Sequence, residues 1–168
     1  QTLNETLFGD DMDDFYHAYA GRNYWIDDDF EEIDFLPFPD INAYFDTISS
    51  SYANQSQLKT GEKAALVWAC GVAAKQVYTS SISGTFGVIQ AYNALLRFVF
   101  TDANYLDGNS PNIHTELAEN MMEARPALLA VLDPAGPGHN LVTDGYNTDG
   151  FYHLNFGWGG SYNGWYLI

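Results

Sequence analysis

A histidine and an asparagine near the carboxyl end of the sequence have the residue types of a catalytic pair. His139 follows a glycine at the start of an expected strand, and Asn155 lies sixteen positions later on the next one. In a cysteine peptidase an imidazole takes the thiol proton and returns it to the leaving amine, while an amide carbonyl fixes the imidazole tautomer. A hairpin around Gly145–Gly150 can bring the two side chains across from each other on one face.

An indole adds a third feature to this pair. Trp158 is placed to cover an Asn–His hydrogen bond and shield it from water, and glycines at 157, 159 and 160 let the ring pack close. A lone histidine beside a glycine is more often structural. The combination of His139 with Asn155 and the glycine-flanked Trp158 favours catalysis.

The elements that would position these residues change in type along the chain. Apolar residues at helical spacing predict helices over residues 61–78, 85–100 and about 113–124. The expected buried positions are Ala65, Leu66, Ala69, Cys70, Ala73 and Val77 in the first helix, and Phe86, Ile89, Asn93, Leu96 and Phe100 in the second. From Pro126 the pattern is that of strands, over 127–132, 139–143 and 151–156, with turns at Asp144-Gly145 and 148–150. Helices first and an antiparallel sheet last predict an α+β fold.

Residues 1–60 form an acidic, aromatic-rich segment in which we expect loops and one or two short helices. Pro37 and Pro39 argue against a helix at their positions. Acidic clusters at 10–14 and 27–34 lack the alternating ligands and central glycine of a calcium loop. We therefore interpret them as a solvated acidic face. Residues 61–168 carry the helices and the sheet, and 168 residues are expected to form a single domain overall.

The charge balance excludes several partners. Six basic residues against 22 acidic ones give a net charge of −16, whereas binding to phosphate or to an anionic membrane needs clustered Lys and Arg. No apolar run is long enough to span a membrane. No three His, Cys or carboxylate positions have zinc-site spacing, so we expect no metal and no cofactor.

Three stretches of sequence carry a resemblance to a known family. They are Gly138-His139-Asn140-Leu141-Val142-Thr143-Asp144-Gly145-Tyr146, Phe151-Tyr152-His153-Leu154-Asn155-Phe156-Gly157-Trp158-Gly159-Gly160 and Asn163-Gly164-Trp165-Tyr166. They resemble the catalytic segment of the streptopain-like family of bacterial cysteine peptidases, within the papain-like superfamily. Arg125-Pro126 and the segment from Leu66 to Gly84 fit the same family. The resemblance covers residues 62–168 and implies a papain-like fold.

The resemblance also implies roles for matching residues. His139 would be the catalytic base, Asn155 its orienting partner and Trp158 the covering indole. The residues implied in substrate binding are Ser83, Gly84 and Gly138. The implied substrate is a peptide or protein with a bulky apolar residue at P2, and the family is made with a signal peptide and is secreted or exported.

The nucleophile that this site would serve has no counterpart at the expected place. Cys70 is the one cysteine, and it matches a non-catalytic helix cysteine of the family, so we expect it to be a small core side chain. Three accounts fit. The chain is a processed or excised fragment, which its abrupt end favours; or a second chain or upstream segment carries the nucleophile; or it is an inactive relative that binds peptides or proteins.

Other residues that could be mistaken for functional ones have structural interpretations. His153 alternates onto the same face as Asn155, and we expect it to pack or hydrogen-bond within the sheet. Asp144 is interpreted as a turn residue. The rings of Tyr162, Trp165 and Tyr166 could form a carbohydrate platform, but core and groove lining is preferred, and the helices argue against a carbohydrate-binding β domain.

We predict that an epoxide inhibitor directed at papain-like nucleophiles leaves the native chain unmodified. Intact-mass analysis after incubation measures this. A stoichiometric adduct on Cys70 would show that the active thiol is misplaced here and that the chain is itself a peptidase. The absence of an adduct supports a catalytic half without its nucleophile.

Overall fold

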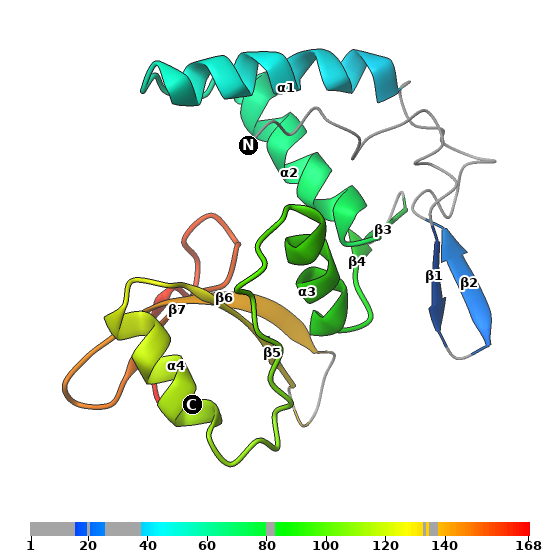
Figure 1. The fold of residues 1–168 in the computed structure, drawn as a ribbon. Coiled ribbons are helices and arrows are strands. Elements are labelled where there is room, and N and C mark those ends of the chain that lie inside the picture. The colour runs from blue at the N-terminus through cyan, green and yellow to red at the C-terminus, as the bar shows by residue number, and fades with distance from the viewer. Residues whose placement is uncertain (1–15, 20, 26–37, 80–82, 133, 135–137) are drawn as a thin grey trace. The chain divides into compact units, whose positions relative to one another are not determined.

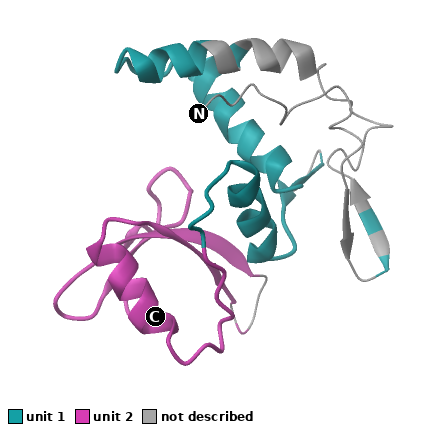
Figure 2. Cartoon of the chain, in the orientation of Figure 1, with its two compact units in different colours: residues 1–103 teal, residues 104–168 magenta. Residues whose placement is uncertain are grey.

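The structure is a computed structural model of the chain. It describes residues 16–19, 21–25, 38–79, 83–132, 134 and 138–168. These form two compact units, Gln1–Ala103 and Asn104–Ile168, shown in different colours in Figure 2. The acidic clusters at 10–14 and 27–34 and Pro37 lie outside the described residues.

A β-hairpin lies in the amino-terminal segment, where the sequence predicted loops. Strands β1 (Tyr16–Tyr19) and β2 (Arg22–Trp25) pair antiparallel, with Tyr16 opposite Trp25. The prediction is wrong here because the aromatic residues of this stretch favour strands. Gly21 has φ +79°, the left-handed conformation that a tight hairpin turn requires.

The first helix contains a proline that the sequence analysis took as excluding it. Helix α1 runs from Phe38 to Ala53, so Pro39 lies in its first turn. A proline there loses no hydrogen bond, because the first backbone N–H groups of a helix have no partner within the helix. The expectation of only short helices is therefore also wrong.

Helix α2 (Thr60–Ala73) packs on α1 (Figure 1). The buried residues of this contact are Ile48, Ala65 and Ala69, with Leu58 and Leu66 packed against them. At the start of α2, the backbone N–H of Lys59 donates to the Glu62 carboxylate at 2.8 Å. The helix ends at Ala73, and Val77–Tyr78 instead form strand β3, which pairs with strand β4 (Ser83–Gly84).

Helix α3 (Val88–Arg97) buries a different face from the predicted one. All five predicted positions, from Phe86 to Phe100, are exposed, whereas Gln90 and Ala94 are buried. The buried face is held by polar contacts. The Gln90 amide donates to the carbonyls of Ala74 at 2.9 Å and Lys75 at 3.0 Å, just past the end of α2, and accepts from the Phe86 N–H at 2.8 Å.

The second unit is one helix on one sheet (Figure 1). Helix α4 (Ile113–Met122) covers a four-stranded antiparallel sheet in chain order. The strands are β5 (Ala127–Val131), β6 (His139–Tyr146), β7 (Tyr152–Asn155) and β8 (Gly164–Tyr166). Leu117 of α4 meets Leu141, Tyr152 and Leu154 in the buried core. Helices followed by an antiparallel sheet confirm the predicted α+β order.

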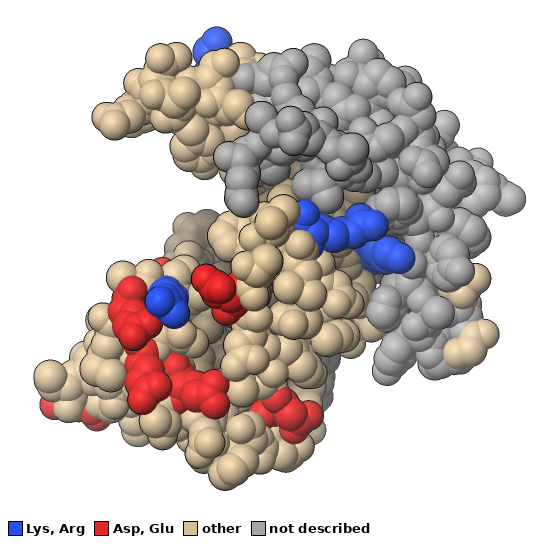
Figure 3. Space-filling model, viewed as in Figure 1, with Lys and Arg blue, Asp and Glu red and all other residues tan. Residues whose placement is uncertain are grey.

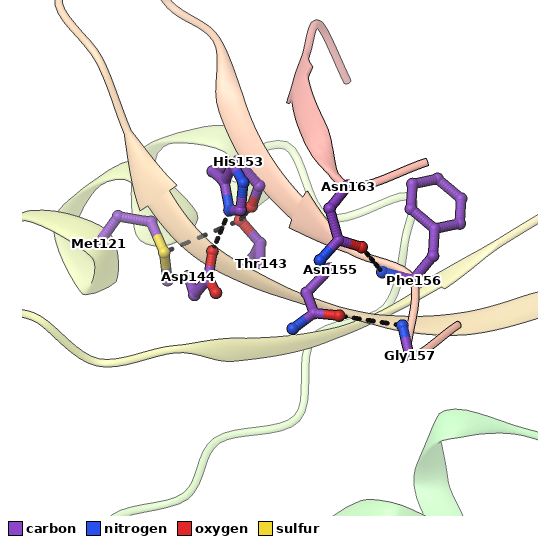
Figure 4. Close-up of polar contacts among 8 residues, drawn as sticks. All are labelled: Met121, Thr143, Asp144, His153, Asn155, Phe156, Gly157 and Asn163. Atoms are coloured by element: carbon purple, nitrogen blue, oxygen red, sulfur yellow. Dashed lines mark hydrogen bonds and ion pairs between the residues drawn. The ribbon is translucent and has the colours of Figure 1, made fainter. Parts of the chain in front are cut away.

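A β-bulge replaces the turn predicted at Asp144-Gly145. Strand β6 continues to Tyr146, and Asp144 is the extra residue between the Thr143–Leu154 and Gly145–His153 pairs. The fully buried Thr143 hydroxyl donates to the His153 carbonyl at 3.1 Å (Figure 4). The chain reverses further on, because the Asn147 side chain accepts the N–H groups of Asp149 and Phe151 at 3.0 and 2.9 Å.

The surface of the second unit is strongly acidic. Its described carboxylates are Asp107, Glu116, Glu119, Glu123, Asp144 and Asp149, and Arg125 is the one Lys or Arg between residues 104 and 168. Figure 3 shows acidic side chains gathered on the face that carries α4. Among the described helices, none has the length and apolar character needed to cross a membrane.

We predict that Gln90→Ala destabilises the chain by about 1–3 kcal/mol, because it removes three hydrogen bonds of a buried side chain to part-buried backbone groups. The free energy of unfolding in urea, followed by circular dichroism, measures the loss. Asn93→Ala on the exposed face of the same helix is the matched control and should change stability little. Equal effects of the two substitutions would contradict this role for Gln90.

Candidate active site

The three predicted catalytic residues lie in the second unit at the same end of its sheet. His139 begins β6, Asn155 ends β7, and Trp158 lies in the loop between β7 and β8. The register pairs His139 with Val131 and Asn155 with Val142. The hairpin therefore forms as predicted. The prediction that His139 lies directly across from Asn155 is wrong, because Asn155 is opposite Val142, three residues beyond His139 on β6.

A single peptide group links the two side chains instead. His139 Nε2 lies 3.0 Å from the Phe156 carbonyl oxygen, and the Gly157 N–H donates to Asn155 Oδ1 at 3.0 Å (Figure 4 shows the Asn155 contact). The Phe156 C=O and the Gly157 N–H belong to the same planar peptide unit. His139 and Asn155 thus bind its opposite ends.

The carbonyl partner decides the tautomer of His139. A carbonyl oxygen only accepts, so Nε2 must carry the proton that is shared with Phe156. In the neutral ring the lone pair then lies on Nδ1. That is the state a general base needs, with one nitrogen anchored and the other able to take a proton.

Aromatic rings cover the imidazole. The Trp158 ring centroid lies 4.5 Å from that of His139 at 30°, and the Phe156 centroid lies 6.0 Å away at 15°. Trp158 packs on Phe156 and on Tyr162, and it is 52% exposed. The indole therefore lies against the imidazole itself, and Phe156 is a neighbour that the sequence analysis did not assign.

Backbone conformation, not space, requires the glycines around Trp158. Gly157, Gly159 and Gly160 have φ of +77°, +61° and +94°, and a Cβ added at any of them meets no atom within 4 Å. The prediction that these glycines make room for the indole is therefore wrong, and their positive φ explains them instead. Positive φ is the region that side chains with a Cβ rarely adopt.

Asn163 is a site residue that the sequence analysis missed. Its Oδ1 accepts the Phe156 N–H at 3.0 Å, across the loop that contains Trp158 (Figure 4). Phe156 is thus held at its N–H by Asn163 and at its carbonyl by His139. The Asn163-Gly164 pair before an aromatic strand could have been interpreted as a turn signal, but nothing local in the sequence indicates a partner seven residues away.

His153 is part of the sheet, as predicted. Its Nδ1 binds the Asp144 carboxylate across the bulge (Figure 4), and its ring meets Trp165 edge-on at 5.4 Å. Asp144 therefore anchors a histidine instead of forming a turn. Tyr162 and Trp165, which were expected to line the core or a groove, are 70% and 51% exposed.

The residues expected to contact substrate are distributed over both units. Ser83 and Gly84 are exposed in β4 of the first unit, and Gly138 is exposed directly before His139 in the second. A Cβ on Gly138 would lie 3.0 Å from a Leu132 side-chain carbon and 3.3 Å from the Val131 carbonyl oxygen. A side chain at Gly138 would therefore crowd the end of β5, although the exposed Leu132 side chain can move aside.

Cys70 is exposed, so the prediction that it lies in the core is wrong. The helix face that α2 buries carries Ala65, Ala69 and Ala73. Neighbouring atoms still shield the sulfur from water, and this desolvation raises the pKa of the Cys70 thiol. Burial, and secondarily the Cys70 thiolate, raise the pKa of Tyr78 to about 12. Catalytic cysteines have the opposite property, a lowered pKa.

Comparisons with known proteins identify the family of the chain. The model of the peptidase C10 family matches residues 33–166, so the chain belongs to that family. It is 50% identical over 52 residues to the thiol protease/hemagglutinin PrtT of Porphyromonas gingivalis, a match that covers 31% of this chain and 5% of that protein.

Solved structures give the same class. Active wild-type interpain A cysteine protease of Prevotella intermedia matches with a TM-score of 0.53 and 27% identity, over 67% of this chain and 51% of that one. A Prevotella intermedia prointerpain A fragment with a cysteine-to-alanine mutation matches with a TM-score of 0.53 and 28% identity. This match covers 67% of this chain and 38% of that fragment. The fold is therefore papain-like, and the chain spans about half or less of the length of these relatives.

We predict that Cys70 is alkylated more slowly in the native chain than in the unfolded chain at pH 8. The raised pKa lowers the thiolate fraction, and the thiolate is the reactive form. The rate against pH, followed by mass spectrometry, should rise at higher pH for the native chain. Because the folded state favours the protonated thiol, its small contribution to stability is lost as the pH rises through the native pKa. Coincident profiles would contradict the desolvation.

Proposed function

We propose that this chain carries the base half of a cysteine-type endopeptidase, with the nucleophilic cysteine on another segment or chain. The observation that carries this proposal is the contact between His139 Nε2 and the Phe156 carbonyl, because it leaves Nδ1 as the proton acceptor. Cys70 does not fit the role of nucleophile, since the pKa of its thiol is raised.

In the proposed reaction His139 moves one proton twice. Nδ1 takes the proton of the nucleophilic thiol, and the thiolate attacks the carbonyl carbon of the scissile peptide bond. The imidazolium then gives that proton to the leaving amine, and water releases the acyl group by the same route. The Phe156 carbonyl and the face of Trp158 stabilise the charged ring, through a charge-assisted hydrogen bond and a cation–π contact.

Asn155 orients the base through the peptide group between Phe156 and Gly157. Its carbonyl oxygen accepts the Gly157 N–H, which fixes the plane of the Phe156 carbonyl on the opposite side of that unit. A donated N–H also polarises the peptide and makes its carbonyl a stronger acceptor for His139. The amide side chain thus acts without touching the imidazole.

The substrate assignment follows the family. We propose peptide or protein substrates with a bulky apolar residue at P2, with Gly138, Ser83 and Gly84 beside the substrate backbone. Secretion or export belongs to the same proposal. Catalysis by these residues needs no metal or organic cofactor.

A second candidate function is a peptide- or protein-binding module without turnover. The observation in its favour is that Cys70 is the one cysteine of the 168 residues and is not activated in its own unit. This candidate predicts peptide binding that is indifferent to the protonation state of His139.

The test joins the chain to the nucleophile-bearing segment of a peptidase C10 relative and measures hydrolysis of fluorogenic peptides with Leu, Phe or Gly at P2. We predict activity that favours the apolar residues. His139→Ala should lower kcat by about 10²–10⁴-fold, the typical contribution of a general base. His114→Ala, on α4 of the same unit, is the matched control and should retain activity.

Two outcomes separate the candidates. Hydrolysis that survives His139→Ala would refute the base assignment. Peptide binding by the fusion without hydrolysis, equal in the His139→Ala variant, would favour the binding module.

A further inference from the structure

The loop between β7 and β8 holds the residues around His139 in a strained backbone. Within residues 156–163 the backbone has positive φ at three glycines and at Tyr162, where φ is +63°. A bulky side chain rarely adopts that conformation, so surrounding contacts must impose it. The loop therefore depends on its anchors to keep its shape.

Asn163 is the anchor at the far end of this loop. Its side-chain oxygen accepts the Phe156 N–H at 3.0 Å, and its own N–H donates to the Gly160 carbonyl at 3.2 Å. One residue thus joins the start, the middle and the end of the loop. The Tyr166 hydroxyl, donating to the Tyr162 carbonyl at 2.6 Å, supports the strained position next to it.

Phe156 is held through both of its peptide groups. Its N–H belongs to the peptide that Asn163 binds, and its carbonyl belongs to the peptide shared by His139 and Asn155. Figure 4 shows the contacts of Asn163 and Asn155. Two peptide planes that meet at one Cα have only two soft torsions between them. Fixing the first plane therefore limits where the second can direct its carbonyl oxygen.

We propose that Asn163 is a positioning residue for His139, acting through the Phe156 backbone. Its amide oxygen holds the Phe156 N–H, so that the Phe156 carbonyl stays on Nε2 and the imidazole keeps its lone pair on Nδ1. This inference rests on the proposed function only for its catalytic meaning. The tautomer of His139 is a property of this chain without substrate or nucleophile.

The test is nitrogen-15 NMR of the His139 ring in the full 168-residue chain at neutral pH. In the unsubstituted chain the two ring nitrogens should give the separate signals of a single Nε2–H tautomer. Asn163→Ala removes the acceptor, and the two signals should move toward each other as the tautomers mix. Asn163→Asp keeps an oxygen at that place and should restore the separation.

A second turn amide of the same sheet provides the matched control. Asn147 accepts two backbone N–H groups in the β6–β7 turn, so Asn147→Ala removes a structural contact of the same kind. It should lower stability and leave the His139 signals unchanged. An equal shift in both variants would reduce Asn163 to a merely structural residue and overturn the proposal.

A second variant guards against misfolding. Asn163→Ser shortens the side chain while keeping it polar, and it should mix the tautomers as the alanine variant does. Unchanged His139 signals in a folded Ala or Ser variant would overturn the proposal. The NMR result does not depend on the peptidase assay. If Asn163→Ala shifts the His139 signals while the fusion is inactive, the proposed function fails and the positioning role of Asn163 stands.

Discussion

One peptide group, between Phe156 and Gly157, is the constraint on which the candidate site depends. Its carbonyl fixes the proton of His139 on Nε2, and its N–H is held by Asn155. A peptide unit is planar, so its two ends cannot be reoriented independently. His139 and Asn155 are therefore coupled through this peptide group, without a hydrogen bond between their side chains. The strand ends and the loop between β7 and β8 hold the peptide group in place.

The sheet of the second unit supplies the rigid part of this arrangement. Leu141 and Leu154 bury one face of β6 and β7 against α4, so the strand ends that carry His139 and Asn155 are tied to the core. The loop beyond Asn155 meets this core only at its start, where the partly buried Phe156 packs against it. The rest of the loop is held by side-chain amides and by contacts of Phe156 with the exposed rings of Trp158 and Tyr162.

Polar side chains, more than apolar stripes, explain where the structure departs from the sequence pattern. Gln90 lies on the buried face of α3, where its amide binds the carbonyls beyond α2, whereas the predicted apolar positions are exposed. Asp144 leaves the predicted turn and binds His153 across a bulge. Periodicity reports average burial, and it does not reveal that a buried amide such as that of Gln90 must keep its hydrogen-bond partners.

The sequence by itself determined the α+β order and the family, and it predicted the three residues of the candidate site. These follow from local patterns: helical and strand periods, turn residues, and a motif of fixed spacing. Only the tertiary structure decided that Asn155 lies opposite Val142, that Phe156 and Asn163 belong to the site, and that Cys70 is exposed. Register, bulges and side-chain partners arise from contacts between distant residues, which spacing along the chain does not encode.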